Sequence, residues 1–379
     1  MKGKQGLVCM GLLLVLSSCS CHTGKQITAS GLQRKDFQTE VNGQHTDLFT
    51  LSNKQGMEVC ITNYGARVVS ILVPDRNGKR EDVVCGFSTI TEYMEQRQNF
   101  GSTVGRYIGR ILNARFTLDG VEYKLVPNNG KSGHISHGGN PGFADRIWKV
   151  EQADTHRVRL SYLSPDGENG FPGNLKVTLV YSLGEDDNAL DLTYEATTDA
   201  PTVLNLSHHS FFNISGNFTK SVEDQQLWVD ADRFTPYDDK KCVTGEYLPV
   251  AGTPLDFRMP HTIGECIDAD HPQLKVVNGY DHTWELNTKG DDTRPAAWVY
   301  DPASGCKMEI FTTEPGMQIY TGNGLKGKMT GKGGIAYPFR SAVCFETMHF
   351  QDSPNQPGFP STVLRPGEVF RSHTVYKFE

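Results

Sequence analysis

Short runs of β-branched and aromatic residues, separated by turn signals, recur along most of the chain. The runs that predict strands cover residues 58–73, 116–118, 121–123, 157–163, 175–182, 190–197, 307–313, 342–348 and 369–378. Between two of them, Asp119-Gly120 is a hairpin signal, because these residue types accept the positive φ of a two-residue turn. The pattern predicts strands as far as the C-terminus.

One helical start signal interrupts the strands. Thr89 and Glu92 have the spacing of a capping box ahead of Tyr93 and Met94, which predicts a short connecting helix. Many strands with little helix favour packed sheets over alternating α/β units. No internal repeat or Gly/Ser-rich linker divides this part of the chain. We therefore expect an all-β fold, one large antiparallel β-sandwich with few short helices, over residues 37–379.

The N-terminus has the features of a targeting signal. A lysine-bearing start precedes an apolar run from Leu7 to Leu16 that is too short to span a bilayer. Leu16-Ser17-Ser18-Cys19 resembles a lipobox with Cys19 as the lipidated residue. Residues 1–18 are thus predicted to be a lipoprotein signal peptide, and residues 19–36 the lipidated cysteine and a flexible tether. We expect a bacterial cell-envelope protein, an outer-membrane or periplasmic-side lipoprotein held to the membrane by its lipid alone.

Charge and cysteine content narrow the choice of partner. The net charge of −7 is spread along the chain without a basic cluster, which argues against nucleic acid as a partner. The cysteines beyond the leader form no C-x-x-C pair and have no zinc-finger spacing, so no metal or cofactor is predicted. They suit buried core positions at least as well as disulfides. The expected partner is a neutral small molecule.

Polar clusters stand out against the apolar strands, at residues 105–110, 134–139, 205–210, 279–282 and 344–347. Glu346 lies inside an apolar strand, where alternation places it with Ala342 and Cys344 on a buried or cleft-lining face. Carboxylates in such places have raised pKa values and are typical general bases. His209 follows an apolar strand in a run of polar neighbours that can orient its imidazole, although His208 and His209 could also merely cap the strand end. Together the clusters offer the donors and acceptors that a hexose requires.

In this order, and over nearly the whole mature chain, the clusters resemble the aldose 1-epimerase family. The matching segments are Gly105 to Arg110 (family G-R-x-x-N-R), His137 to Gly139 (H-G-G), Asn205 to Asn213 (N-L-T-N-H-S-Y-F-N), Tyr280 to His282 (F-D-H), Gln318 to Asn323 (Q-x-Y-T-G-N) and Phe345 to Thr347 (L-E-T). The resemblance implies a galactose mutarotase-like β-supersandwich that interconverts the α and β anomers of free aldohexoses such as galactose and glucose. No metal or cofactor is implied.

The resemblance also assigns roles to six residues. Glu346 corresponds to the general base and His209 to the general acid, while His137 assists near the ring oxygen of the sugar. The side chains that hold the sugar hydroxyls correspond to Arg110, Asp281 and Gln318.

Two positions depart from the family pattern. Gly109 stands where the family commonly has Asn, which removes an amide from the sugar site and puts the substrate range in doubt. His208 stands where the family commonly has Asn before the catalytic His.

Three other functions are compatible with parts of the pattern. A glycoside hydrolase would use Asp281 and Glu346 as paired carboxylates about 5 to 9.5 Å apart, and would leave His209 without a role. A non-catalytic sugar-binding lipoprotein would not need both a base and an acid. A phosphosugar epimerase would be expected to carry an extra basic cluster beside the site, and none is seen.

Overall fold

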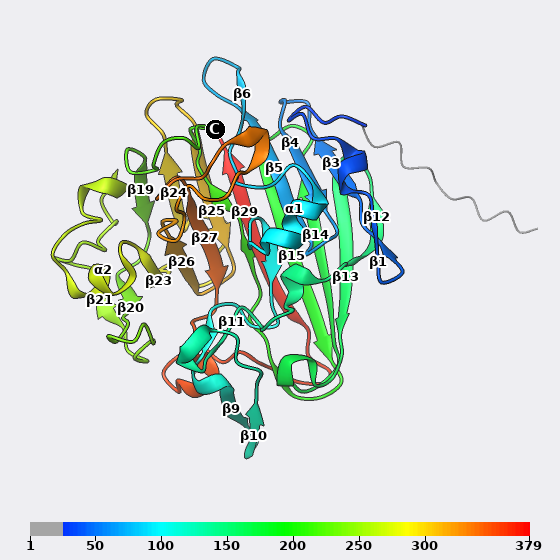
Figure 1. The fold of residues 1–379 in the computed structure, drawn as a ribbon. Helices are drawn as coiled ribbons and strands as arrows, with labels where there is room; N and C mark the ends of the chain where they lie inside the picture. Colours follow the sequence, from blue (N-terminus) through cyan, green and yellow to red (C-terminus); the bar gives the residue numbers. More distant parts are fainter. Residues whose placement is uncertain (1–25) are drawn as a thin grey trace, which may run out of the picture.

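The computed structural model of the protein describes residues 26–379 (Figure 1). The predicted signal peptide and Cys19 lie outside the described residues. Residues 26–36, which we expected to belong to the tether, pack against the fold. Leu32 is buried, the backbone N–H of Ala29 donates to the Glu58 carboxylate at 2.6 Å, and Arg34 binds Asp47. The fold therefore includes residues N-terminal to the predicted start at residue 37.

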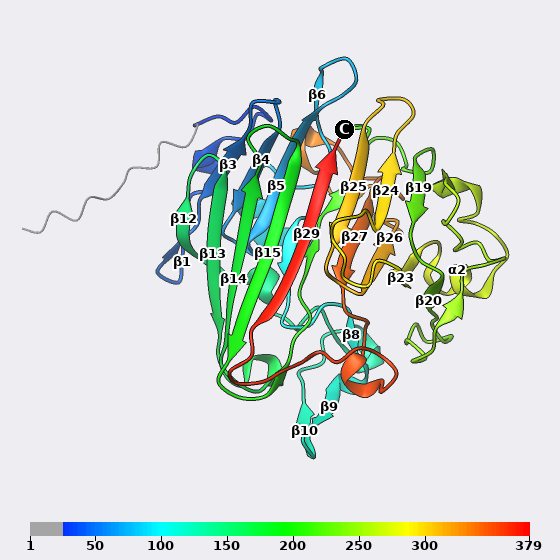
Figure 2. The ribbon, with the colours of Figure 1, turned by 180° about the vertical axis from the view of Figure 1, so that it is seen from behind.

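A nine-stranded antiparallel sheet forms one whole layer of the molecule (Figure 2). Its strands, in spatial order, are β12 (Lys149–Ala153), β13 (Arg157–Ser164), β14 (Leu175–Leu183), β15 (Ala189–Thr198), β29 (Phe370–Phe378), β25 (Lys307–Thr312), β24 (Ala297–Tyr300), β19 (Gln226–Val229) and β22 (His261–Thr262). Along β15, β25 and β29 buried side chains alternate with more exposed ones. This period of two gives the sheet one face directed at the core.

Two smaller antiparallel sheets cover that inner face (Figure 1). One has the order β3 (Leu48–Ser52), β4 (Glu58–Thr62), β5 (Arg67–Pro74) and β6 (Arg80–Asp82), and the other β18 (Phe211–Phe212), β27 (Val343–Met348), β26 (Gly316–Tyr320), β23 (Asp281–Glu285), β20 (Arg233–Thr235) and β21 (Leu248–Pro249). One hydrophobic cluster joins all three sheets, through Val59, Leu179 and Phe345 among others. The architecture is the predicted large β-sandwich.

Short strand pairs and single turns connect these layers. The pairs are β1 (Glu40–Val41) with β2 (Gln44–His45), β7 (Ser102–Val104) with β17 (Ser207–His209), β8 (Arg110–Ile111) with β11 (Ile135–Ser136), β9 (Arg115–Leu118) with β10 (Val121–Lys124), and β16 (Thr202–Val203) with β28 (Val363–Leu364). The 3₁₀ turns are Arg34–Phe37, Leu112–Ala114, Gly130–Ser132, Phe143–Asp145, Glu168–Gly170, Ile263–Glu265, Lys332–Gly334 and Ser353–Asn355. Within residues 26–379 the α-helices are α1 (Ile90–Gln96) and α2 (Pro272–Val277). Neither is long and apolar enough to cross a membrane.

The local signals read from the sequence form as predicted. The hairpin β9–β10 pairs Leu118 with Val121 around Asp119-Gly120. At the start of α1, Thr89 Oγ1 accepts from the Glu92 N–H at 3.2 Å and the Glu92 carboxylate accepts from the Thr89 N–H at 2.9 Å. The cysteines at positions 60, 85, 242, 266, 306 and 344 are free thiols, and all but Cys266 are buried.

Candidate active site

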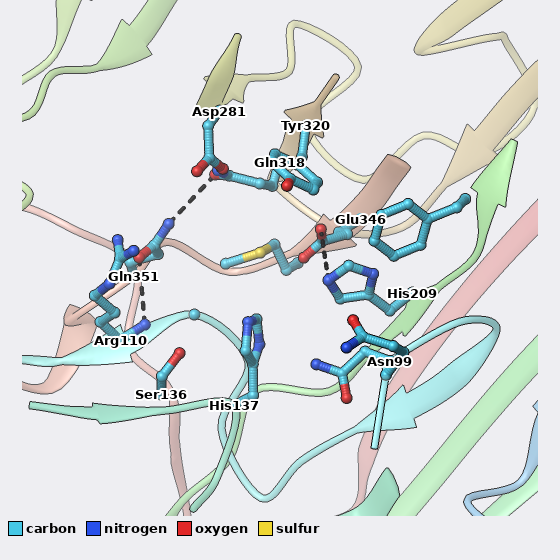
Figure 3. Close-up of a pocket in the computed structure, with 14 residues that line it drawn as sticks. Asn99, Arg110, Ser136, His137, His209, Asp281, Gln318, Tyr320, Glu346 and Gln351 are labelled. Atoms are coloured by element: carbon cyan, nitrogen blue, oxygen red, sulfur yellow. Dashed lines mark hydrogen bonds and ion pairs between the residues drawn. The ribbon is translucent and has the colours of Figure 1, made fainter. Parts of the chain in front are cut away.

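Three adjacent strands of the six-stranded sheet bring three of the candidate side chains together. Register places Glu346 of β27 opposite Gln318 of β26, and Gln318 opposite Thr283 of β23. Asp281, two residues before Thr283, starts β23 and points toward Gln318 in Figure 3. Because residues two apart in a strand lie on one face of a sheet, Glu346, Gln318 and Asp281 form a row of polar groups across it.

The other three candidates come from short strands packed beside this sheet. His209 ends β17, which pairs with β7, and Arg110 on β8 pairs with Ser136 of β11. His137 follows Ser136 with a φ of 52°, in the left-handed region. The turn continues through Gly138, where a Cβ would lie 2.0 Å from the Gly105 carbonyl oxygen. This close approach requires glycine at residue 138.

All six candidate residues line one cavity of about 250 Å³ (Figure 3). At one end His209 Nε2 lies 3.2 Å from Glu346 Oε1, and both side chains are almost completely buried. The imidazole stacks on Phe211 at 5.1 Å and lies 5.5 Å from the His137 ring, centroid to centroid. Among the described residues, no other side chain or backbone N–H donates to the Glu346 carboxylate. The His209–Glu346 pair is thus the centre of the acid–base end of the cavity.

Burial sets the proton affinities at this end. It raises the pKa of Glu346 well above its ordinary value, and the nearby Asp281 carboxylate adds to the rise. Burial and the neighbouring His137 lower the pKa of His209 well below its ordinary value. Burial, with a contribution from the Arg110 guanidinium, lowers the pKa of His137 to about 4. Burial therefore favours the protonated form of the Glu346 carboxyl and the neutral form of the His209 imidazole.

Hydrogen bonds organise the opposite end. Gln318 Nε2 donates to Asp281 Oδ1 at 2.6 Å, and Thr283 Oγ1 donates to Gln318 Oε1 at 2.5 Å. Burial raises the pKa of Asp281, but the Arg110 guanidinium and the bond from Gln318 oppose that rise. The bond from Thr283 fixes which end of the Gln318 amide faces Asp281. This end presents a guanidinium, a carboxylate and an amide in fixed positions, and we call it the hydroxyl-binding end after the role that the family resemblance implies for it.

Sequence reasoning missed one residue of this end, Gln351. It is buried, lines the cavity, donates from Nε2 to the Tyr237 hydroxyl at 2.7 Å and accepts from the Arg110 backbone N–H at 3.3 Å. A Cβ on Gly109 would lie 2.5 Å from Gln351 Cγ, and Gly109 has a φ of 73°. The Gln351 side chain therefore fills the space beside Gly109. Its amide lies near the position where an Asn at residue 109 would place one. The signal in the sequence was Gly109 itself, but its partner is 242 positions away along the chain.

The other departure, His208, lies outside the cavity. Alternation along β17 turns it away from His209 and into the core, where its ring nitrogens contact Ser210 Oγ at 2.6 Å and the Tyr181 hydroxyl at 3.4 Å. Burial lowers the pKa of His208 to about 3. It is a neutral core residue that does not contact a ligand in the cavity.

Within residues 26–379, one group of side chains comes close enough together to hold a single metal ion. Its members are His209, Glu346 and Cys344, whose possible ligand atoms all lie within 4.8 Å of one another. Cys344 Sγ is 3.6 Å from His209 Nδ1, and burial raises the pKa of this thiol well above its ordinary value. In this environment the thiol packs as a small apolar group behind the imidazole. We therefore describe the group as an acid–base pair backed by a thiol.

The fold and the site define a class of protein: a β-sandwich with a buried histidine–carboxylate pair at one end of a polar cavity and a guanidinium, a carboxylate and an amide at the other. Comparison with known proteins agrees. A family model for aldose 1-epimerase matches residues 47–377. Galactose mutarotase from Bos taurus is 40% identical over 331 residues, which cover 87% of this chain and 93% of that protein. Aldose 1-epimerase from Escherichia coli K12 is 36% identical over 339 residues, covering 89% and 96%.

Solved structures give the same result. An aldose epimerase homologue from C. elegans superimposes with a TM-score of 0.81 at 31% identity, covering 88% of this chain and 99% of that one. A galactose 1-epimerase from Lactobacillus acidophilus gives a TM-score of 0.78 at 28% identity, covering 90% and 97%. The chain belongs to the aldose 1-epimerase family, a family of isomerases.

Proposed function

We propose that Glu346 and His209 are the base and the acid with which this enzyme interconverts the α and β anomers of free aldohexoses such as galactose and glucose. The Glu346 carboxylate takes the proton of the anomeric hydroxyl while the His209 imidazolium gives a proton to the ring oxygen. The bond between C1 and the ring oxygen breaks, leaving the open-chain aldehyde. Rotation about C1–C2 and the reverse transfers then close the ring as the other anomer.

The observation that carries this proposal is the 3.2 Å contact between His209 Nε2 and Glu346 Oε1 in a buried cavity. In this proposal the pair holds a single proton, and moving it from Glu346 to His209 creates the carboxylate and imidazolium that ring opening needs without changing the net charge. Ring opening returns the pair to its neutral form. Activity should therefore fall at low pH, when the pair gains a second proton, and at high pH, when it loses its last.

The remaining candidate residues hold the sugar. Arg110, Asp281 and Gln318 face the cavity at the end away from the pair, and their fixed donors and acceptors suit sugar hydroxyls. His137 lines the cavity beside His209, and its buried Nδ1 has no protein partner among the described residues. A bond from the sugar ring to this imidazole would satisfy that nitrogen.

Polarimetry tests the proposal directly. Purified protein is added to freshly dissolved α-galactose and α-glucose, and the decay of optical rotation is corrected for the spontaneous rate. The wild type should accelerate the decay, and Glu346→Gln should lose about 10² to 10⁴-fold of that acceleration, the usual contribution of one general base. If Glu346→Gln kept near-normal activity, the proposed mechanism would be wrong.

Parallel assays separate the rival functions. Incubation with methyl galactosides should release no sugar, because a blocked anomeric oxygen has no proton for Glu346 to remove. Hydrolysis there would support the paired-carboxylate mechanism instead. Sugar binding by calorimetry without any acceleration of mutarotation would mark a non-catalytic binding protein.

We further propose, from the sequence of residues 16–19, that the enzyme is a lipoprotein of the bacterial cell envelope anchored through Cys19. The anchor would hold a domain that acts on sugars entering the envelope. Replacing Cys19 by Ala should move the protein from the membrane to the soluble fraction and remove the lipid mass from its N-terminal peptide. Unchanged fractionation and peptide mass would reject the anchor.

A further inference from the structure

The Cys344 thiol is a buried group beside the acid–base pair that the proposed mechanism leaves without a role. Cys344 is fully buried and does not line the sugar cavity, so a ligand in the cavity does not touch it. Its Sγ lies 3.6 Å from His209 Nδ1, within hydrogen-bonding reach for sulfur. Any effect of Cys344 on the reaction must therefore pass through the imidazole of His209.

Strand register places both ring nitrogens of His209 against β27. The pairing of β18 with β27 sets Phe211 opposite Cys344. Because the two strands are antiparallel, His209, two residues before Phe211, comes beside Glu346, two residues after Cys344. His209 Nε2 thus lies 3.2 Å from Glu346 Oε1 (Figure 3), while Nδ1 faces the thiol. One strand supplies the partner of each nitrogen.

These two partners decide which ring nitrogen of neutral His209 carries the proton. Burial favours the protonated Glu346 carboxyl, whose O–H requires an acceptor, and His209 Nε2 is within its reach. Nε2 accepts only when the proton of the neutral ring is on Nδ1, from which it is donated to Cys344 Sγ. The hydrogen bond at one ring nitrogen sets the tautomer, so even a weak acceptor such as sulfur shifts the balance.

A thiol in this place adds no charge behind the imidazole. His349 shows the alternative, because its Nδ1 contacts Glu314 Oε2 at 2.7 Å. Burial lowers the pKa of His349, but the hydrogen bond and charge of Glu314 outweigh burial and raise it above its ordinary value. The pKa of His209 stays well below its ordinary value, through burial and the neighbouring His137. An imidazolium formed at His209 is therefore a strong acid, which suits proton donation to a weakly basic ring oxygen.

We propose that Cys344 is a positioning residue that holds the proton of neutral His209 on Nδ1 and so reserves Nε2 for the proton exchanged with the sugar. This inference rests on the proposed function. One proton passes from Glu346 to Nε2 and on to the ring oxygen, while the proton of the anomeric hydroxyl returns to Glu346. The proton on Nδ1 stays bonded to Cys344 throughout. In the other tautomer Nε2 already carries a proton and cannot take one from Glu346.

NMR of protein with isotopically labelled histidine rings measures the tautomer of His209 directly. The wild type should show a proton on Nδ1 and none on Nε2 near neutral pH, with the signals identified by their loss in His209→Asn. In Cys344→Ala the tautomer with the proton on Nε2 should appear. Cys344→Ser, whose hydroxyl accepts the same hydrogen bond, should restore the proton to Nδ1. A proton on Nε2 in the wild type would overturn the proposal.

Polarimetry with α-galactose gives the effect on the reaction. Cys344→Ala should lower kcat about three- to tenfold, as expected for the loss of one hydrogen bond, and leave KM within about twofold because the thiol does not touch the sugar. Cys344→Ser should recover most of the lost kcat. The matched control is Cys85→Ala, which removes another buried thiol from the same hydrophobic cluster and should change neither kcat nor the tautomer.

The outcomes separate this inference from the function on which it rests. A lower kcat in Cys344→Ala with the wild-type tautomer would overturn the proposal, because the backbone of residue 209, which also bonds its own ring, would then hold the proton. Unchanged kcat and tautomer would overturn it as well. Should Cys344→Ala fail to fold by circular dichroism, Cys344→Val replaces it with the same expected results. If the wild type accelerated no sugar, the proposed function would fail, whereas NMR would still report the tautomer.

Discussion

Glu346 and Asp281 line the same cavity from strands of the same sheet, but they differ in their partners. Glu346 is buried near the Cys344 thiol, and among the described residues its one ion-pair or hydrogen-bond partner is the imidazole of His209, which stacks on Phe211. Asp281 accepts a 2.6 Å bond from Gln318 and lies near the Arg110 guanidinium. Burial raises the pKa of both carboxyl groups, but for Asp281 these two partners oppose the rise.

The difference shows how one sheet supports two kinds of chemistry. A carboxylate that lacks donors gains most from a proton, which supports the proposal that Glu346 exchanges protons with a ligand. A carboxylate that keeps donors stays an acceptor, which suits Asp281 for binding hydroxyls. The hydrogen bond from Gln318 and the nearby Arg110 guanidinium, and not the sheet that carries both groups, set Asp281 apart from Glu346.

The largest expected effect comes from removing the acid–base end. Glu346→Gln and His209→Asn should each lower kcat by about 10² to 10⁴-fold, because each proton transfer contributes that much. Because the two groups share one proton, the double variant should be little worse than the poorer single one. Polarimetric rates at saturating galactose measure all three variants, and calorimetry with galactose serves as the control for retained binding.

Additive losses in the double variant would contradict the shared proton and make the two residues independent contributors.

The hydroxyl-binding end should respond differently to the same isosteric change. Asp281→Asn should raise KM for galactose and lower kcat/KM about 10- to 100-fold, since a hydrogen bond to a charged group contributes about 1.5–3 kcal/mol. Its kcat should stay close to that of the wild type. Glu346→Gln is the matched control, with the same carboxyl-to-amide replacement at the other end of the cavity.

Loss of kcat with an unchanged KM in Asp281→Asn would make Asp281 a proton-transfer group and erase the distinction between the two carboxylates.

Most of the fold could be predicted because its signals are local. Alternation along β14, β15 and β29, the Asp119-Gly120 turn and the Thr89–Glu92 capping box each depend on residues close in sequence. The short helix α2 was missed, because six residues offer too little periodicity to be distinguished from a loop. Residues 26–36 were assigned to the tether for the same reason, since Leu32 is their only buried apolar residue.

The six candidate residues could be predicted because the motifs that contain them follow one another along the sequence in the family's order. All six candidate residues meet in one cavity, although nothing in the sequence shows which ends they occupy. Gln351 was missed because its role depends on contact with Gly109 across the fold. His208 looked like a departure in the site, and only the pairing of β17 with β7 shows that it faces the core.

A smaller effect is expected from disturbing the packing of Gln351 against Gly109 at the hydroxyl-binding end. Gly109→Asn should cost about 1–3 kcal/mol of unfolding free energy, because its Cβ would meet Gln351 Cγ at 2.5 Å and its φ is positive. Combining it with Gln351→Ala frees that space and should restore part of the stability and place an amide near Arg110 again. Urea unfolding and KM for galactose are measured on both singles and the double.

If the double variant were no more stable than Gly109→Asn, backbone strain at residue 109 and not the side-chain contact would explain the glycine.

The smallest predicted effect is on stability, and it concerns a histidine–carboxylate contact outside the cavity. Comparison of this contact with the His209–Glu346 pair shows what burial contributes to that pair. His373 is a third exposed, and its imidazole contacts Asp191 Oδ1 at 3.2 Å and Asp292 Oδ2 at 2.7 Å. The hydrogen bond to Asp191, with a further one to Asp292, raises the pKa of His373 to about 8 against the opposing effect of burial. The direction is opposite to that of buried His209.

Because the folded pKa of His373 lies above the unfolded value of about 6.5, its stabilising contribution is fully present below about pH 6.5 and is lost as pH rises through about 8. After allowance for solvent screening, we expect about 1 kcal/mol. His373→Gln should therefore lower the urea unfolding free energy at pH 6 by about that amount and have little effect at pH 9, where the wild-type imidazole is neutral. An equal loss at both pH values would mean that packing, and not the charge of His373, stabilises this contact.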